Sequence, residues 1–297
     1  MRYLVFEAGG RAALSAELFF LHRANRGDGD SLLLADMDPL YGEVPAGDGA
    51  VVRMTEADAL ALLADREASR DILIFPADEL ARQGKRDVQA HASSHPFSAV
   101  EPWYFHKRLM NERLADVTSG CTIRIPKTFS TDRIFLRPDT MSAGSHGVRG
   151  MENTCITELV EVEREYVVDV DWLGDEPAIY PREVRIKHGY DKYIRFLPAD
   201  GPLGTAVHEF VRAMRTGYAP LTNGVFHLQL IEDRQGHLFF VEYSKRISGT
   251  SAVNVVRGFN PFDTLAGAAT PVRRDLFAEE TWYRYEDLLL SMHSLRP

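Results

Sequence analysis

The stretch Gly224–Asn254 limits the possible folds more than any other, because it contains two alternating segments joined by a short turn. Apolar and polar side chains alternate over Val225–Ile231 and again over His237–Tyr243. Asp233–Gly236, between them, supplies turn-forming residues. This pattern predicts a β-hairpin.

One face of the predicted hairpin gathers oxygen-bearing side chains. Gln229 and Glu242 are expected to lie opposite each other, and Ser244, two residues further along, points the same way. Such ligands suit Mg²⁺, which usually keeps several waters and completes its coordination with substrate phosphates, and Mn²⁺ is the alternative. Arg246 is one pleat further on and is expected to reach the same phosphates. A solvated hairpin with ordinary polar residues is the competing interpretation.

Length and charge limit the function classes. The chain has 297 residues, enough for two or three compact lobes, and its net charge of −9 argues against a nucleic-acid binder or an anionic-membrane partner. Cys121 and Cys155 show no metal-ligand spacing, which fits a reducing compartment. The sequence shows neither a signal peptide nor an apolar run of the roughly 18 residues that a membrane span needs. We therefore expect a soluble, cytoplasmic protein acting on small molecules, and a homodimer is compatible with these properties.

The first hundred residues alternate between strand and helix patterns. The predicted strands are Arg2–Glu7, Leu32–Ala35, Ala50–Val52 and Asp71–Phe75, and the predicted helices are Ala12–Ala24 and Glu56–Asp65. This order predicts a parallel α/β domain. The turn Ala8–Gly10, with Asp36 and Asp38 further on, is superficially similar to a dinucleotide fingerprint but lacks the GxGxxG pattern. An NAD enzyme is therefore kept as a rival hypothesis.

A helix, a strand and a loop of small residues follow. The predicted helix Pro102–Leu114 carries Lys107, and the predicted strand Ile134–Arg137 ends at Arg137. The next residues are small, and their backbone N–H groups can approach phosphate oxygens closely. Candidates in that loop are Ser142, Gly144 and Gly147.

The second half of the chain adds strands, helices and a basic cluster. Cys155–Val160 and Glu165–Val170 are predicted strands. Positive residues gather within Pro181–Arg195, namely Arg182, Arg185, Lys187, His188, Lys192 and Arg195. They either neutralise a transferring phosphoryl group or form a solvated charged loop. Thr205–Arg215 is predicted to be an amphipathic helix, and Gly249–Arg257 a helix whose N-terminus faces the phosphate site.

These elements, in this order, resemble the ATP-grasp enzymes, especially the carbamoyl phosphate synthetase type. The run from Glu242 to Arg246 is similar to that family's glutamate, any residue, asparagine, proline, arginine pattern, with Ser244 and Lys245 at the asparagine and proline positions. Arg137, Pro138 and Gly144 resemble its phosphate loop. The sequence TELVEVEREYVVD is similar to its adenine-binding hinge.

The resemblance implies an α/β fold with an N-terminal parallel-sheet (pre-ATP-grasp) domain, residues 1–101, followed by an ATP-grasp domain, residues 102–297, of two α+β lobes. Its nucleotide lobe would cover about 102–175, and its metal and substrate lobe about 176–297. ATP would bind at Lys107 and Arg137 through its α- and β-phosphates, at the 140–148 loop, at adenine-facing Glu158, Leu159 and Val160, and through its ribose at Glu165. The metal ligands would be Gln229, Glu242 and Ser244, and the catalytic groups Arg246, Arg185 and Lys187.

The activity implied by the resemblance is that of an ADP-forming ligase. A carboxylate, such as that of an amino acid or another small molecule, would attack MgATP to give an acyl phosphate, which an amine or a thiol then displaces. A nucleotide-binding protein without ligase activity is the alternative, because Ser244 and Lys245 depart from the metal motif. A role of His146 or His188 in proton transfer is left open.

Overall fold

The structure is a computed structural model. It describes residues 1–8, 11–23, 26–43, 49–75, 77, 79–127, 134–137, 155–187, 191–268 and 281–283. Of residues 11–14, 80–81, 134–137, 155–156, 185–187, 191–193, 256 and 281–283, only the backbone is described.

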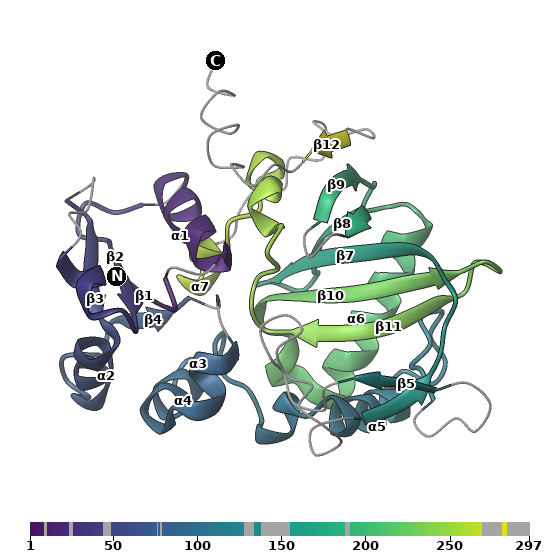
Figure 1. Ribbon diagram of the computed structural model, residues 1–297, viewed down its shortest axis with the longest axis horizontal. Coiled ribbons are helices and arrows are strands. Elements are labelled where there is room, and N and C mark those ends of the chain that lie inside the picture. Colours follow the sequence, from purple (N-terminus) through teal and green to yellow (C-terminus); the bar gives the residue numbers. More distant parts are fainter. Residues whose placement is uncertain are drawn as a thin grey trace.

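The N-terminal part forms a parallel sheet, as predicted. Its strands are β1 (Arg2–Phe6), β2 (Ser31–Asp36), β3 (Val51–Thr55) and β4 (Ile72–Ile74), in the order β3-β2-β1-β4. The connections contain α1 (Arg11–Leu21), the 3-10 helix η1 (Pro39–Glu43) and α2 (Glu56–Ala64), and α3 (Glu79–Gly84) and α4 (Arg86–Ser93) follow β4. Figure 1 shows these elements together on the left of the molecule. Strands β1 and β2 are apolar over most of their length because both sheet faces are covered.

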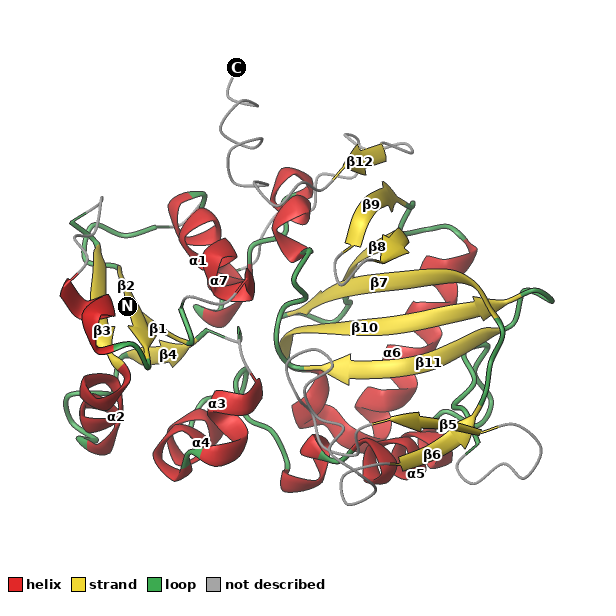
Figure 2. Ribbon diagram, in the orientation of Figure 1, coloured by secondary structure: helices red, strands yellow, loops and turns green. Residues whose placement is uncertain are grey.

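A larger antiparallel sheet fills the other half of the molecule (Figure 2). Its strands are β7 (Val162–Trp172), β8 (Ala178–Lys187), β9 (Asp191–Phe196), β10 (Gly224–Asp233), β11 (Leu238–Ser244) and β12 (Thr281–Tyr283), in the order β11-β10-β7-β8-β9-β12. A separate two-stranded ribbon pairs β5 (Ile134–Arg137) with β6 (Cys155–Glu158). The predicted lobe limit near residue 175 falls between β7 and β8, which are hydrogen-bonded neighbours in one sheet.

One face of this sheet packs against two helices, α5 (Lys107–Val117) and α6 (Pro202–Thr222). Alternate residues of the strands, such as Phe226 and Leu228, meet Phe210 and Met214 of α6 in a buried core. Helix α6 is longer than the predicted Thr205–Arg215, and it is kinked at Tyr218. The kink lies two residues before Pro220, whose ring disfavours a regular helical turn. The opposite face of the sheet is therefore the one left to carry a site.

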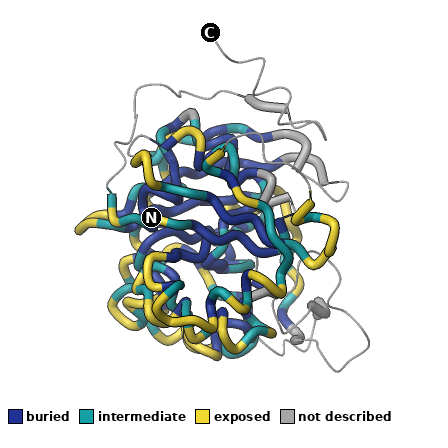
Figure 3. The backbone as a smooth tube through the Cα atoms, turned by 90° about the vertical axis from the view of Figure 1, so that its left-hand side faces the viewer, coloured by how far each residue is buried: buried dark blue, intermediate teal, exposed yellow. Residues whose placement is uncertain are grey.

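The last helix of the described residues, α7 (Pro261–Leu265), packs into the core of the N-terminal domain. The Phe262 ring stacks on Phe75 with centroids 4.3 Å apart and meets Tyr3 edge-on at 4.8 Å. Arg23 Nε donates to Asp263 Oδ1 at 3.1 Å, both side chains being buried. Figure 3 shows this side of the molecule, with buried strands running through its middle. Residues distant in sequence thus share one core.

Three local predictions need correction. The predicted helix Pro102–Leu114 is divided into a 3-10 helix η2 (Pro102–Phe105) and α5, with His106 in an extended conformation between them. The predicted helix Gly249–Arg257 is a 3-10 helix, η4 (Ser251–Arg257). The basic segment within Pro181–Arg195 lies largely on β8 and β9, because the alternating apolar residues there pair in register. Among the described residues, no helix is long and apolar enough to cross a membrane.

Candidate functional site

The β10–β11 hairpin has the predicted pairing, with Gln229 directly opposite Glu242. The register shifts just beyond this pair, so that Leu230 faces Phe240. Leu238 and Phe240 point into the helix-covered core, and so does Tyr243, three residues after Phe240. Without this bulge, strict alternation would turn Glu242 toward the apolar core. The bulge therefore places the Glu242 carboxylate on the sheet face opposite α5 and α6.

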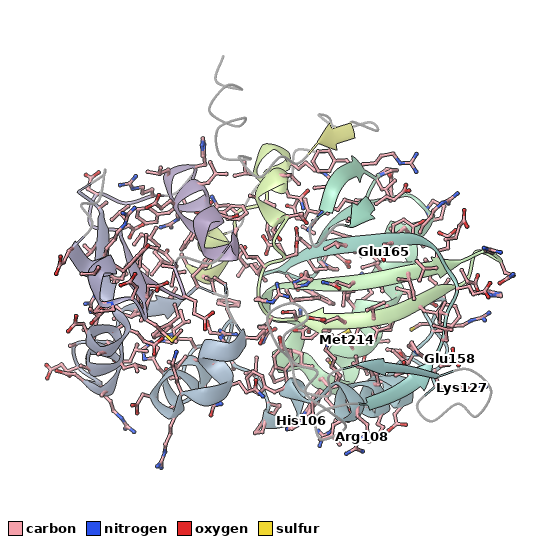
Figure 4. All side chains as sticks on the ribbon, viewed as in Figure 1. His106, Arg108, Lys127, Glu158, Glu165 and Met214 are labelled. Carbon is pink, nitrogen blue, oxygen red and sulfur yellow. The ribbon has the colours of Figure 1, made fainter. Side chains whose placement is uncertain are left out.

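Glu242 meets two cations that come from distant parts of the chain. Lys107 Nζ lies 3.0 Å from Glu242 Oε2, and Arg246 Nη2 lies 3.8 Å from Oε1. Lys107 is the first residue of α5, 135 positions earlier in the sequence, and Figure 4 labels its neighbours His106 and Arg108 there. Burial raises the pKa of Glu242, but the positive charges of Lys107 and Arg246 outweigh it and lower that pKa to about 2. A predicted phosphate ligand and a predicted metal ligand thus share one ion pair.

Ser244, the third predicted metal ligand, has its hydroxyl engaged elsewhere. Its Oγ donates to Glu79 Oε1 of α3 at 2.5 Å and accepts from the Arg246 N–H at 3.2 Å. Tyr104 donates to the same Glu79 oxygen. The role of Ser244 as a metal ligand stays a prediction, with Glu79 competing for its hydroxyl.

Lys245 stands where the family pattern has proline. Its backbone N–H donates to the Tyr104 hydroxyl, a bond that proline has no hydrogen to make. Its buried ammonium group donates to backbone carbonyls at the end of α6, including that of Leu221 at 3.1 Å. Burial lowers the pKa of Lys245, and the neighbouring Arg82 lowers it further. This lysine therefore anchors the end of β11 to α6.

His227, which sequence reasoning overlooked, lies two residues before Gln229, on the sheet face opposite α5 and α6. Its side chain is fully buried, and it pairs in register with Ser244 on one side and Asp169 on the other. Its Nδ1 lies 2.7 Å from the backbone oxygen of Arg246. Burial, together with the charge of Arg246, lowers the pKa of His227 to about 4. The ring is therefore neutral at pH 7, and its Nδ1–H donates to the Arg246 carbonyl. The sequence did contain a signal for this position: side chains of a strand alternate with a period of two, so His227 lies on the same face as Gln229.

Asp169 of β7 and Arg182 of β8 form a second ion pair on the same face, also overlooked. Arg182 was predicted to belong to a basic cluster that either neutralises a phosphoryl group or forms a solvated loop, but the structure buries its side chain completely. Its Nη1 lies 2.5 Å from Asp169 Oδ2. The pair contacts the segment that follows Arg246, through hydroxyl and amide groups of Ser248, Thr250, Ser251 and Asn254.

The residues predicted to bind adenine and ribose lie at the end of β6, in the connection that follows it, and on β7. The Glu158 N–H donates to the backbone oxygen of Lys127 at 2.9 Å, and Figure 4 shows these two residues near each other. Leu159 is 40% exposed and so leaves apolar surface uncovered just before β7. Val160 is half-buried, as is Glu165, which lies on β7 beside Ile231 of the β10–β11 hairpin. Their roles in nucleotide binding stay predictions.

Other predicted residues are only partly described. Arg137 is on β5, paired with Cys155, and its side chain is not described. The backbones of Arg185 and Lys187 lie on β8, again without a described side chain. Ser142, Gly144, His146, Gly147 and His188 lie outside the described residues.

The donor set at the hairpin suits a shared metal ion. Within the described part of the chain, no group of three or more His, Cys, Asp or Glu residues could hold a metal by itself. Glu242 supplies an ionised carboxylate and Gln229, opposite it, an amide oxygen. Two oxygen donors fit Mg²⁺ that is also held by nucleotide phosphates and water.

Comparison with solved structures identifies the fold. No protein-family model matches the sequence, and no curated protein matches it. N5-carboxyaminoimidazole synthetase from Staphylococcus aureus, complexed with ADP, has a TM-score of 0.63 at 12% identity, covering 99% of this chain and 85% of that chain. L-amino acid ligase from Bacillus licheniformis has a TM-score of 0.60 at 11% identity, covering 90% and 73%. Biotin carboxylase from Campylobacter jejuni, in a beta-gamma-ATP complex, has a TM-score of 0.62 at 13% identity, covering 91% and 72%.

These three proteins are members of the ATP-grasp superfamily. The expected architecture, a parallel N-terminal sheet followed by antiparallel strands and helices, is confirmed along nearly the whole chain. The chain therefore has the ATP-grasp fold, as its sequence motifs predict.

Proposed function

We propose that the protein is an ADP-forming ligase that joins a small carboxylate to an amine or a thiol through an acyl phosphate. The observation that carries this proposal is the contact between Lys107 and Glu242 at 3.0 Å. The sequence motifs assign these residues to the nucleotide and to the metal, and the fold brings them to one point. A cation and an ionised carboxylate at that point suit the phosphates and the metal ion of MgATP.

The chain's own residues would bind and orient ATP. Lys107 would exchange its contact with Glu242 for the nucleotide's phosphates, and Arg137 would hold them from the β5–β6 ribbon. Glu242 and Gln229 would hold Mg²⁺, which neutralises phosphate charge when bound. Glu158, Leu159 and Val160 would line the adenine site, and Glu165 would bind the ribose.

Arg246 is the residue we assign to the chemistry. A carboxylate oxygen of the substrate attacks the γ-phosphorus, and the bond to the bridging oxygen breaks, releasing ADP. The nucleophile then attacks the acyl carbon, loses its proton, and inorganic phosphate leaves. Arg246, partly exposed beside Glu242, would bind the carboxylate and then the oxyanion of the tetrahedral adduct.

The structural neighbours support this reaction class. They include a synthetase complexed with ADP, an amino acid ligase and a biotin carboxylase in complex with a nucleotide. One further neighbour, from Aspergillus clavatus, is complexed with ADP and an aminoimidazole ribonucleotide. A cytoplasmic location and a homodimer stay predictions.

A nucleotide-binding protein without ligase activity is the second candidate. The observation that favours it is the bond between Ser244 and Glu79, which occupies the hydroxyl expected at the metal. Such a protein would bind ATP but release no ADP with any substrate pair.

The test measures ADP release from ATP and Mg²⁺ with a panel of small carboxylates and amines. Hydroxylamine added with the correct carboxylate should trap a hydroxamate, because it intercepts an acyl phosphate. Arg246→Ala should lower turnover by about a hundredfold or more while ATP affinity changes little. Arg234→Ala, an exposed arginine at the hairpin turn, is the matched control and should leave turnover unchanged. Release of AMP and pyrophosphate with the productive substrate pair would contradict the acyl phosphate.

A further inference from the structure

Asp169 and Arg182 form an ion pair that is almost completely buried. Their side chains are 1% and 0% exposed and lie on adjacent strands, on the sheet face opposite α5 and α6. Removing two charges from water is costly, and a buried ion pair stabilises a protein no better than apolar residues of similar volume in many cases. The partners of the pair's other hydrogen bonds indicate which part of the protein the pair positions.

Within the part of the chain that the structure describes, every other side-chain hydrogen bond of the pair goes to one stretch, residues 248–254. Asp169 Oδ1 accepts from Ser251 Oγ at 2.6 Å, and its Oδ2 accepts from Asn254 Nδ2 at 2.7 Å. Arg182 donates to Thr250 Oγ1 at 2.9 and 3.1 Å, and also to the Ser248 hydroxyl. The pair thus holds this stretch in place through several hydrogen bonds.

Ser251 connects the Asp169–Arg182 pair to the backbone beside Arg246. Its Oγ donates to Asp169 and accepts from the Ser248 N–H at 2.8 Å. Ser248 is two residues after Arg246, whose own carbonyl is held by His227. Ile247, between them, is fully buried. The backbone that carries the Arg246 side chain is therefore fixed on its C-terminal side by a chain of bonds that ends at the buried ion pair.

We propose that Asp169 and Arg182 are positioning residues, which act through Ser251 to hold the 246–254 segment and so orient Arg246 for catalysis. This inference rests on the proposed function only in taking Arg246 as the catalytic group. Both side chains of the pair are buried, so we expect them to act through this segment and not by contacting the substrate. A guanidinium that stabilises a transition state must be held in place, because a misplacement of about 1 Å can cost a hundredfold in rate.

The test removes the connecting hydroxyl and leaves the ion pair intact. Ser251→Ala should lower kcat about tenfold, while the KM for ATP stays within about twofold. Thr264→Val is the matched control, because it deletes a buried hydroxyl that donates to Asp171 of the same strand at 2.7 Å. It should leave kcat unchanged, since Thr264 lies outside the 246–254 segment.

A double-mutant cycle separates positioning from general stability. In an Arg246→Ala background, Ser251→Ala should lower kcat by less than about twofold, because there is no longer a guanidinium to orient. An equal loss in both backgrounds, an unchanged kcat, or the same loss in Thr264→Val would overturn the proposal.

Amide hydrogen exchange gives a readout that needs no substrate. Ser251→Ala should speed exchange at the Ser248 amide about tenfold, whereas Thr264→Val should leave it unchanged. Unchanged exchange in both variants, or equal acceleration in both, would refute the claim that the pair holds this segment. If no substrate in the panel supports turnover, the proposed ligase function fails, and the exchange comparison then decides by itself whether the segment is held.

Discussion

Replacing Glu242 with glutamine tests the central ion pair through its effect on stability. Glutamine keeps the shape of the side chain but cannot carry the charge that Lys107 and Arg246 face. The pKa of Glu242 is lowered from 4.5 to about 2 in the folded protein, and its side chain is only 15% exposed. Since one pKa unit corresponds to about 1.4 kcal/mol, Glu242→Gln should lower the free energy of unfolding by about 3 kcal/mol at pH 7.

The pH dependence gives the sharper test. A carboxyl group with a lowered folded-state pKa stabilises the fold above its unfolded pKa, and that stabilisation is lost as pH falls through the folded pKa. The difference between wild type and Glu242→Gln should therefore be full at pH 7, begin to shrink below about pH 5 and halve near about pH 3. Urea unfolding with EDTA and without nucleotide measures it, and Trp103 and Trp172 in the adjacent core serve as fluorescent probes.

Glu112→Gln is the matched control for this experiment. Glu112 also meets a cation at 3.0 Å, Arg108, but that pair is 41% and 46% exposed. Its loss should cost no more than about 0.5 kcal/mol, as expected of an exposed helical ion pair. If the Glu242→Gln difference matches this control, or stays constant from pH 7 to pH 3, the charge environment assigned to Glu242 is wrong.

Three further predictions concern other parts of the molecule. Gly224→Ala should destabilise the protein by about 1–3 kcal/mol in urea unfolding, because Gly224 has φ +79° and an added Cβ would lie 2.9 Å from Phe97 Cβ. Gly236→Ala, at φ +82° in open space, should cost only about 1 kcal/mol. Asp171→Asn should stabilise the protein at pH 7 by up to about 3 kcal/mol, because burial raises the pKa of Asp171 to about 6, and this gain should vanish below about pH 4. Arg137→Ala should weaken ATP binding about tenfold in calorimetry and Arg137→Lys much less, and equal binding by wild type and both variants would place the phosphate loop elsewhere.

Local patterns in the sequence predicted the parts of the fold that local physics determines. The apolar runs gave the parallel strands, and alternation gave the β10–β11 hairpin with Gln229 opposite Glu242. The family motifs placed Lys107 and Glu242 in one site, which the fold brings within 3.0 Å. Hydrophobic periodicity and motif spacing can both be recognised in a single sequence, so these features could be predicted.

Other features depend on contacts between distant residues. The bulge beyond Gln229 is needed to turn both Glu242 and Tyr243 to their proper faces, and alternation alone does not show it. Ser244 meets Glu79 across 165 positions, and no local pattern indicates such a partner. Arg182 belongs to a charged run whose composition is compatible with a solvated loop. Its burial beside Asp169 is seen only in the folded structure. Polar networks of this kind are specified by tertiary structure.

The position of α7 has a consequence for how the chain is made. The ribosome completes the four strands of the parallel sheet long before it reaches Phe262, whose ring fills the space between Tyr3 and Phe75. Arg23 likewise cannot form its ion pair with Asp263 until that residue, 240 positions later, has been synthesised. During synthesis, the nascent N-terminal sheet therefore exposes apolar surface that α7 covers only later, and surface of this kind favours aggregation and chaperone binding. A fragment ending near residue 101 would keep that surface exposed permanently and should aggregate when expressed alone.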